Sequence, residues 1–553
     1  MLRRFGVYMF IIAAMTCAAV TAGQAFGWFR QGIPVSPPPR RHQQTLALLP
    51  LDSRPACTQL VEQLGNLANI RLLLPPEQYL DNYTHPGDRK ALARWLKSSA
   101  SQADAMIIST DMLLSGGLLA SRSRIPTPQE IRAVAELLTD LRRENPRLRL
   151  YSFHIIPRLL LADHTPDRHY QRAMQKYSIL QDQILQFENP LDIKKLAELE
   201  TIIPPRIIEE YRLLYARNEE ANRAWIELAK NGILDALVIG QDDGYHFGLP
   251  NVVKARLESA INSAKLSDTV VLTRGADEVA QTMLGRFANA LKPPVRIYVE
   301  YSAADAPHIV MPFMSHSVAT TVTEKIQLLH ATEVATEQQA DFILFVHIGR
   351  QSSTPGKLQA AAGRLRHLLD SGRSVALVDL AENFYASQTL LPYAIEAGIS
   401  IDRLTAYAGW NTASNAIGTA VTQAALYTGR QKEGASSLRL HYDNLTFTTA
   451  RVLDDWHYLK SIQPQIDKKL LRAGIDPYHL QSHRPNTEAL IRRAMNERSR
   501  LLLRQALNRP FRWPGFEQPF LINAIDPVIQ LPWDRTFEIK LDANLELIQL
   551  KSP

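Results

Sequence analysis

The chain has 553 residues, more than one hydrophobic core usually serves, so two or three domains are expected. Its composition, 46% hydrophobic and 21% charged, is that of a soluble globular protein and excludes an intrinsically disordered one. The net charge of +7 is spread along the chain without a basic stripe, which argues against nucleic-acid binding.

The N-terminal 29 residues differ in composition from the rest of the chain. Arg3 and Arg4 precede a stretch without charged side chains, residues 5–29. A basic start followed by an apolar run predicts that residues 1–29 are a secretory signal peptide. The run also exceeds the roughly 20 apolar residues that span a bilayer, so an anchor that tethers the protein to the inner membrane is the alternative. Either way we expect the body to be exported, to the periplasm or outside the cell.

The folded part is predicted to begin near residue 44. Four prolines between residues 34 and 39 predict an extended tether over residues 30–43. Beyond it, β-rich runs alternate with amphipathic helical stretches, which predicts an α/β fold with mostly parallel sheets. About ten strands are expected, more than the eight of one barrel. This number favours two doubly wound lobes slightly over a TIM-barrel-like core with extra strands.

The alternation divides the body into three regions. A first α/β domain is predicted over residues 44–302, with a polar helical insertion at about 157–231 that is too long for a crossover connection. A second α/β region is predicted over residues 303–430. Residues 431–553 lose the alternation, and we expect them to form a helical pair and a small β element that closes the fold, an α+β part.

Six predicted strands end on acidic residues. In parallel α/β folds the carboxyl ends of the strands line the ligand site, so this pattern predicts a polar, acidic pocket built from distant segments. The acids are Asp52, Asp111, Asp242 with Asp243, Asp277 with Glu278, Glu300, and Asp379 with Glu382. The last three of these residues have no distinctive neighbours and are secondary.

The loop after residue 240 holds the greatest density of polar groups. Residues 241–246 include an amide, two acids, an aromatic ring and a histidine, more than a structural loop needs. Glycosidic cleavage uses one protonated and one ionised carboxyl group. Asp242, Asp243 and Glu278 are therefore predicted as the catalytic acid and base residues, although Glu278 equally suits the first turn of a helix.

Polar and aromatic side chains at other strand ends are predicted to bind the substrate. Asp52 beside Arg54 can hold a pair of sugar hydroxyls or an anionic group, although a helix cap with a structural ion pair explains them equally well. Trp410 can stack on a sugar ring or fill the core. The predicted binding residues are Asp52, Arg54, Asp111, Arg122, Gln241, Arg274, Asp277, Trp410, Asn411 and Asn415.

Other catalytic signatures are missing from the sequence. There is no GxSxG elbow and no complete GxxxxGK[ST] loop, which disfavours serine hydrolases and nucleotide binding. The histidines are scattered without an HExxH pair, and no metal or other cofactor is predicted. Asp163-His164 comes nearest to a metal-binding pair, so a metal-dependent hydrolase with Asp and His ligands stays open.

Five motifs together resemble a bacterial family, the domain of unknown function number 4127. They are Leu-Leu-Pro-Leu-Asp-Ser-Arg-Pro at 48–55, the Ser-Thr-Asp-Met-Leu…Gly-Gly-Leu…Ser-Arg block at 109–122, Gly-Gln-Asp-Asp at 240–243, Gly-Ala-Asp-Glu at 275–278 and Ala-Gly-Trp-Asn-Thr at 408–412. Ser53 stands where the family more usually has a second acid. The resemblance implies one intact fold over nearly the whole exported body and a site at these motifs, without a settled activity.

The sequence as a whole predicts an exported hydrolase that acts on a carbohydrate or cell-envelope glycan through strand-end carboxylates. The expected partner is a small-molecule or glycan ligand; neither a nucleic acid nor a protein partner is inferred. The alternatives are a non-catalytic periplasmic binding protein that holds a polar ligand between two lobes, and the metal-dependent hydrolase.

Overall fold

The computed structural model describes residues 32–162, 166–290, 292–434 and 437–551. The predicted signal peptide or anchor, residues 1–29, lies outside the described residues. Within the described ranges, no helix has both the length and the apolar composition needed to cross a membrane.

The first lobe is a six-stranded parallel sheet in the order β3-β2-β4-β5-β6-β7. Its strands are β2 (Gln44–Leu49), β3 (Ile70–Leu73), β4 (Ala105–Ser109), β5 (Arg149–Ile156), β6 (Ala236–Gln241) and β7 (Val270–Arg274). The chain winds from β2 outward to β3 and then crosses to β4 on the other side. The strand order therefore reverses between β2 and β4, and such a reversal opens a crevice at the carboxyl ends of the strands.

Helices cover both faces of this sheet. Leu46 and Leu48 of β2 face a core shared with α2 and α11, whereas Ala47 and Leu49 face the core shared with α3, α6, α9 and α10. Burial on both faces explains the continuous apolar runs of the strands. The helices of this lobe are α2 (Gln59–Leu67), α3 (Arg89–Ser99), α4 (Thr110–Ser115), α5 (Leu118–Ser121), α6 (Pro128–Glu144), α9 (Pro205–Lys230), α10 (Leu249–Ser263) and α11 (Val279–Asn289).

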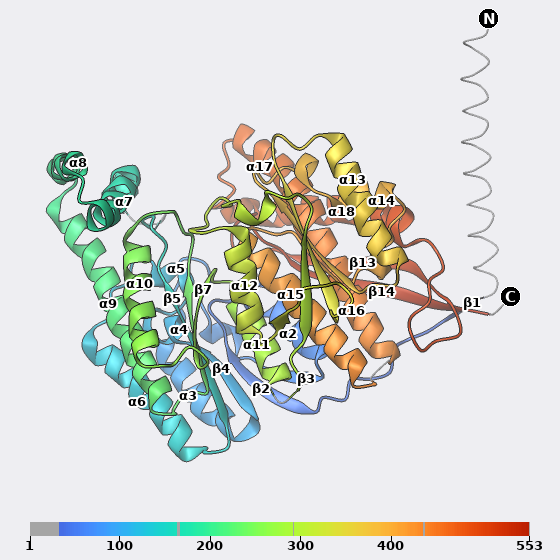
Figure 1. The fold of residues 1–553 in the computed structure, drawn as a ribbon, viewed down its shortest axis with the longest axis horizontal. Coiled ribbons are helices and arrows are strands. Elements are labelled where there is room, and N and C mark those ends of the chain that lie inside the picture. The colour runs from blue at the N-terminus through green and yellow to red at the C-terminus, as the bar shows by residue number, and fades with distance from the viewer. Residues whose placement is uncertain (1–31, 163–165, 291, 435–436, 552–553) are drawn as a thin grey trace, which may run out of the picture.

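The predicted insertion at 157–231 is helical. It holds α7 (Gln171–Phe187), α8 (Pro190–Ile202) and α9, and α7 and α8 project from the edge of the first lobe (Figure 1). The C-terminal part of α9 belongs to the lobe itself, because Trp225 and Ile226 are buried in its core.

The second lobe is a separate five-stranded parallel sheet in the order β12-β11-β10-β8-β9. Its strands are β8 (Arg296–Tyr301), β9 (Thr332–Glu333), β10 (Phe342–Gly349), β11 (Val375–Ala381) and β12 (Ala406–Ala408), and its helices are α12 (Val318–Leu328), α13 (Pro355–Asp370), α14 (Leu391–Glu396) and α15 (Ala413–Lys432). Two open sheets make the body two-lobed rather than a barrel. The sequence division at residue 302 differs from this arrangement, because β8 pairs with β10 of the second sheet.

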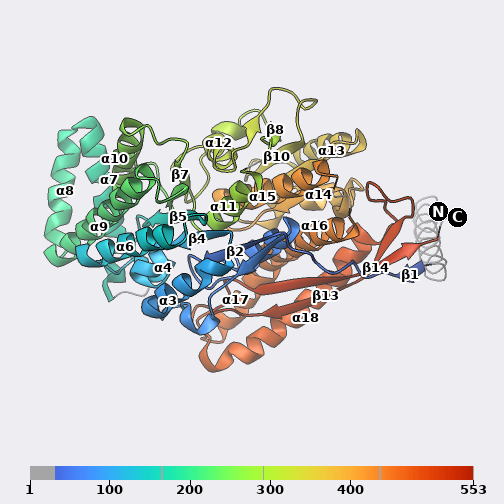
Figure 2. The ribbon, with the colours of Figure 1, turned by 90° about the horizontal axis from the view of Figure 1, so that it is seen from below.

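The two lobes share a helical interface. Helix α15 packs against α12 of its own lobe and against α11 of the first lobe (Figure 2). Its residues from Ala413 to Thr428 are all buried, whereas an ordinary surface helix exposes one face. We conclude that α15 is the central helix that fixes one lobe against the other.

The C-terminal region closes the fold with helices and a third sheet. The helical part is α16 (Leu438–Arg451), the π-helical segment η7 (Val452–Ile462), α17 (Gln463–Arg472), α18 (Arg484–Leu502) and a second π-helical segment, η9 (Leu503–Leu507). The antiparallel strands β13 (Phe520–Gln530) and β14 (Lys540–Leu550) are longer than the small β element expected from the sequence, and they run past α16 and α18 (Figure 2).

The proline-rich segment is extended, as its composition predicts, but it is fastened to the body. Strand β1 (Gly32–Pro34) pairs with β14 in the third sheet. Arg40 forms an ion pair with Asp443 at 3.0 Å, and Arg439 donates to the carbonyl groups of Pro37 and Pro38. The described part of the tether therefore forms an edge of the folded body.

Candidate functional site

A cavity of about 500 Å³ opens where the two lobes and the C-terminal region meet. We call it the main cavity. The first lobe contributes strand-end residues that include Arg54, Arg122, Gln241, Asp242, Asp243, Arg274 and Asp277. The other two regions contribute Phe313, Met314, Ser315, Asn411, Thr412, Asn415, Asp476, Tyr478, His479, Arg535 and Phe537. The site therefore occupies the position that a doubly wound sheet offers to ligands.

The main cavity gathers most of the residues that the sequence singles out. Of the three predicted catalytic residues, Asp242 and Asp243 line it, and Glu278 does not. Seven predicted binding residues also line it: Arg54, Arg122, Gln241, Arg274, Asp277, Asn411 and Asn415. Asp52, Asp111 and Trp410 lie outside its lining.

A buried ion cluster forms one wall of the main cavity. The Arg54 guanidinium lies between two carboxylates, 2.6 Å from Asp52 and 2.6 Å from Asp277. Asn415 donates a further hydrogen bond to Asp277 at 3.4 Å. Burial lowers the pKa of Arg54, but the two carboxylates outweigh it and raise this pKa well above its ordinary value. Asp52 lies outside the lining of the main cavity, so it positions the Arg54 guanidinium and does not touch a ligand there.

A second ion pair holds the loop after β6. Arg122, just after α5, contacts the Asp242 carboxylate at 2.7 Å, and both side chains are nearly buried. The other oxygen of Asp242 accepts the backbone N–H of Asp243 at 2.9 Å. Both carboxylate oxygens of Asp242 therefore have partners within the protein.

Asp243 differs from the other carboxyl groups of the main cavity. Its nearest cation in an ion pair is Arg158 at 4.0 Å, and about a quarter of its side chain is exposed. Burial, followed by repulsion from Asp242, raises the pKa of Asp243 to about 7, although Arg122 and Arg158 oppose the rise. A carboxyl group with this pKa can carry a proton near neutral pH and release it.

Glu278 is held away from the main cavity. Its side chain is fully buried, with one oxygen 2.6 Å from the Lys325 ammonium and 2.6 Å from the Ser414 hydroxyl. The carboxylate lies against α15 at Gly418, where a Cβ atom would be 2.4 Å from the Glu278 Cγ. This close packing explains why a strand-end acid became a structural residue, and it leaves the catalytic prediction for Glu278 without support.

Asp111 and Trp410 also have structural partners. Asp111 is fully buried and accepts the backbone N–H of Ile155 at 3.0 Å, with the His154 ring 3.3 Å away. It therefore ties the end of β4 to β5. The indole N–H of Trp410 donates to Thr419 at 3.2 Å, and its ring lines a neighbouring cavity.

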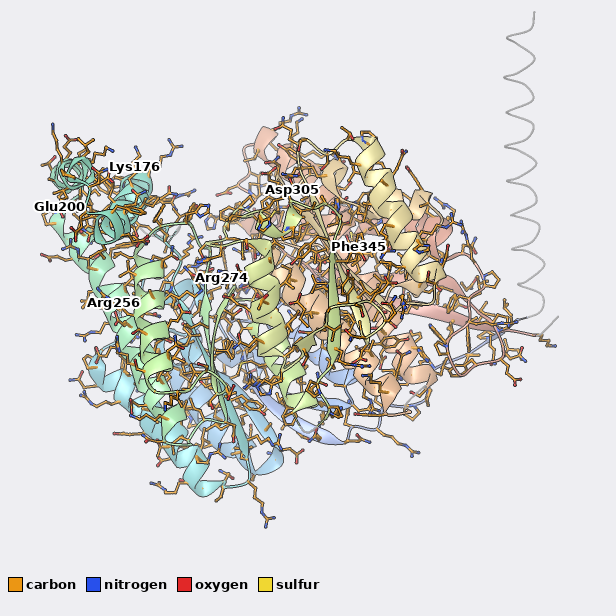
Figure 3. All side chains as sticks on the ribbon, viewed as in Figure 1. Lys176, Glu200, Arg256, Arg274, Asp305 and Phe345 are labelled. Atoms are coloured by element: carbon orange, nitrogen blue, oxygen red, sulfur yellow. The ribbon has the colours of Figure 1, made fainter. Side chains whose placement is uncertain are left out.

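The main cavity is not the acidic pocket that the strand ends predict. Its lining contains six arginines and four aspartates. The arginines are Arg54, Arg122, Arg158, Arg168, Arg274 and Arg535, and the aspartates are Asp242, Asp243, Asp277 and Asp476. Most of these charges pair within the protein. Arg274, for example, lies at the end of β7 (Figure 3). Its guanidinium contacts the carboxylate of Glu324 on α12.

Several lining residues carry no signal in the sequence. Tyr83, Phe313, Tyr478, His479 and Phe537 reach the main cavity from loops that no motif marks. Arg158 follows the end of β5, so the strand-end rule could have found it. The C-terminal residues could not be found in this way, because their place depends on how the third sheet packs across the lobes.

The described residues contain one group of three side chains spaced for a metal ion, formed by Asp52, Cys57 and Asp277. The Arg54 guanidinium already occupies both carboxylates. Burial, and then the negative charge of Asp52, raise the pKa of the Cys57 thiol well above its ordinary value, which disfavours the thiolate that metals bind. This donor set does not fit a cation. The Asp163-His164 pair lies outside the described residues.

A comparison with protein families identifies the chain. A family model described as "Protein of unknown function (DUF4127)" matches residues 46–542. The chain belongs to this family. The matched range includes both lobes and the C-terminal residues that line the main cavity, so the motifs and the cavity lie within one family unit. No curated protein matches the chain.

Proposed function

We propose that this DUF4127 protein is an exported hydrolase that cleaves a glycosidic bond in a carbohydrate or cell-envelope glycan. Asp243 is its general acid and base. The observation that carries the proposal is the contrast among the carboxyl groups of the main cavity: arginines hold Asp242 at 2.7 Å and Asp277 at 2.6 Å, whereas Asp243 lies 4.0 Å from Arg158 and burial raises its pKa to about 7. Carboxyl groups of contrasting environment mark acid and base roles.

The proposed reaction uses one proton carrier and two carboxyl groups that arginines hold in place. The Asp243 carboxyl donates its proton to the glycosidic oxygen while the bond from that oxygen to the anomeric carbon breaks. Asp242 and Asp277 stabilise the positive charge that develops on the sugar ring. A water oxygen then bonds to the anomeric carbon and gives a proton to the Asp243 carboxylate, which restores the acid.

The rest of the main cavity suits a sugar. Arg54, Asp277 and Asn415 form a hydrogen-bonded set that presents planar polar groups to hydroxyls. Tyr83 and Phe537 add aromatic faces to the lining. Export is proposed on the composition of residues 1–29 alone.

A non-catalytic binding protein for a polar ligand is the second candidate. The pairing of most charged groups in the main cavity favours it, because such a rigid polar lining holds a ligand without needing a reactive group. The two candidates differ at Asp243, which only the hydrolase requires as a proton carrier.

The test compares Asp243→Asn with the wild type on glycans released from bacterial cell envelopes and on a set of 4-nitrophenyl glycosides. We expect hydrolysis by the wild type and a loss of about 100-fold or more in kcat/KM in the variant, the usual contribution of a general acid. The control is Asp526→Asn, the same change at an exposed position on β13. Retention of full activity in Asp243→Asn, or binding of glycans without hydrolysis by the wild type, would overturn the hydrolase proposal.

A further inference from the structure

A second cavity, of about 240 Å³, adjoins the main cavity. The two share four lining residues: Arg54, Phe313, Asn411 and Phe537. The two cavities therefore lie side by side against the same four residues.

The second cavity differs in chemistry from the first. Much of its wall is apolar or aromatic, and these residues are Pro55, Ala56, Leu60, Phe313, Phe384, Trp410, Leu459, Phe537 and Ile539. An engineered apolar cavity of about 150 Å³ holds a benzene molecule. The second cavity is large enough for one aromatic ring with a short substituent.

The charged groups of the second cavity are already paired. Arg451 contacts Asp454 at 2.9 Å, and Glu538 contacts Arg535 at 2.7 Å. The Lys460 ammonium donates to the carbonyl oxygen of Gly409, and burial lowers the pKa of Lys460. A ligand that enters here meets charged groups that already have hydrogen-bond or ion-pair partners in the protein, which favours an apolar group over an ionic one.

Three residues of this cavity lining have left-handed backbone conformations. The φ angles are +62° at Phe313, +60° at Phe384 and +46° at Asn411. Bulky side chains rarely adopt this conformation, and such strain gathers at ligand clamps. The Phe313 and Phe384 rings lie 6.4 Å apart and are each 38% exposed, although they are large and apolar.

We propose that the second cavity binds the apolar, ring-bearing aglycone of the substrate. The neighbouring rings of Phe313 and Phe384, which we call the aromatic clamp, contact this aglycone. The substrate class is then a glycoside whose sugar occupies the main cavity and whose leaving alcohol carries an aromatic ring. This inference rests on the proposed glycosidase function. It adds that the preferred substrate is amphiphilic and that the clamp selects the leaving group.

The test measures binding of benzyl alcohol, a model of such a leaving alcohol, to the full-length protein by calorimetry, with glycerol as the polar comparison. Phe384→Asn removes the ring at a position where asparagine tolerates the backbone conformation. The matched control is Tyr385→Asn, a more exposed neighbour that lines neither cavity.

We expect benzyl alcohol to bind and glycerol not to bind. Phe384→Asn should weaken benzyl alcohol binding by about threefold to tenfold, the contribution of one aromatic contact, and Tyr385→Asn should leave it unchanged. Equal binding of the two alcohols, or an unaltered affinity in Phe384→Asn, would overturn the inference. This readout needs no turnover, so the two proposals can fail separately. Benzyl alcohol binding without glycoside hydrolysis would refute the hydrolase proposal alone. Hydrolysis at the same rate for every aglycone would refute the proposal of an aromatic clamp alone.

Discussion

At the scale of single residues, neighbouring side chains give similar carboxyl groups different roles. Asp242 and Asp243 are adjacent in the sequence, yet Arg122 contacts the first at 2.7 Å, whereas Arg158 lies 4.0 Å from the second. Glu278 has the same strand-end origin and is neutralised by Lys325 in the core. The environment of each group, rather than its type, decides which one can transfer a proton.

The raised pKa of Asp243 predicts a pH dependence of stability. The fold raises this pKa from about 3.9 to about 7, so the native state favours the protonated carboxyl. Its contribution to stability is complete below about pH 4 and is lost as the pH rises through about 7. The Asp243→Asn variant has no carboxyl group at this position, so its stability does not fall with pH for this reason.

Urea unfolding of both proteins checks this expectation. Between about pH 4 and pH 8 the free energy of unfolding of Asp243→Asn should rise by about 1 to 3 kcal/mol relative to the wild type. Asp526→Asn, the exposed control, should follow the wild type throughout. A constant difference between Asp243→Asn and the wild type would contradict the raised pKa.

At the scale of elements, α15 joins the two lobes and holds the base of the site. It supplies Ser414 to Glu278 and Asn415 to Asp277, and Thr412 caps its N-terminus. The sequence predicted Asn411 and Asn415 as binding residues in this part of the chain. Their partners on the loop after β7 were not predictable, because they depend on how the lobes dock.

Gly418 of α15 offers a test of this junction. A glycine-to-alanine change inside a helix usually stabilises it by about 0.5–1 kcal/mol. At Gly418, however, the new Cβ atom would lie 2.4 Å from Glu278. Gly418→Ala should therefore destabilise the protein by about 1–3 kcal/mol, as overpacking does, measured by thermal unfolding.

Gly363 provides the matched control within α13. An added Cβ atom there meets nothing within 4 Å, so Gly363→Ala should raise the melting temperature slightly or leave it unchanged. Equal effects of the two substitutions would show that the Glu278–α15 contact carries no packing constraint.

At the scale of the whole molecule, the sequence predicted the α/β alternation and the site at the strand ends. Local patterns are enough for this, because buried parallel strands are apolar throughout and end at one edge of the sheet. The sequence did not predict that β8 joins the second sheet, that residues 32–34 pair with β14, or that Arg535 and Phe537 complete the main cavity. These features arise from contacts between residues hundreds of positions apart.

Contacts between distant parts of the chain explain why the main cavity is not acidic. Asp52 was predicted beside its partner, Arg54, whereas Asp242 and Glu278 were predicted without theirs. Arg122 and Lys325 come from distant elements. Contacts within the first lobe and between the lobes therefore turn a row of acids into a set of ion pairs, and Asp243 is the proton carrier that we propose.

The most direct measurement is a carbon-detected NMR titration of the aspartate carboxyl groups in the full-length protein, with Asp243→Asn used to assign the signal. We expect one aspartate signal, missing in the variant, that titrates with a pKa of about 7. A signal for Asp243 that titrates near the ordinary aspartate value of about 3.9 would contradict the central claim.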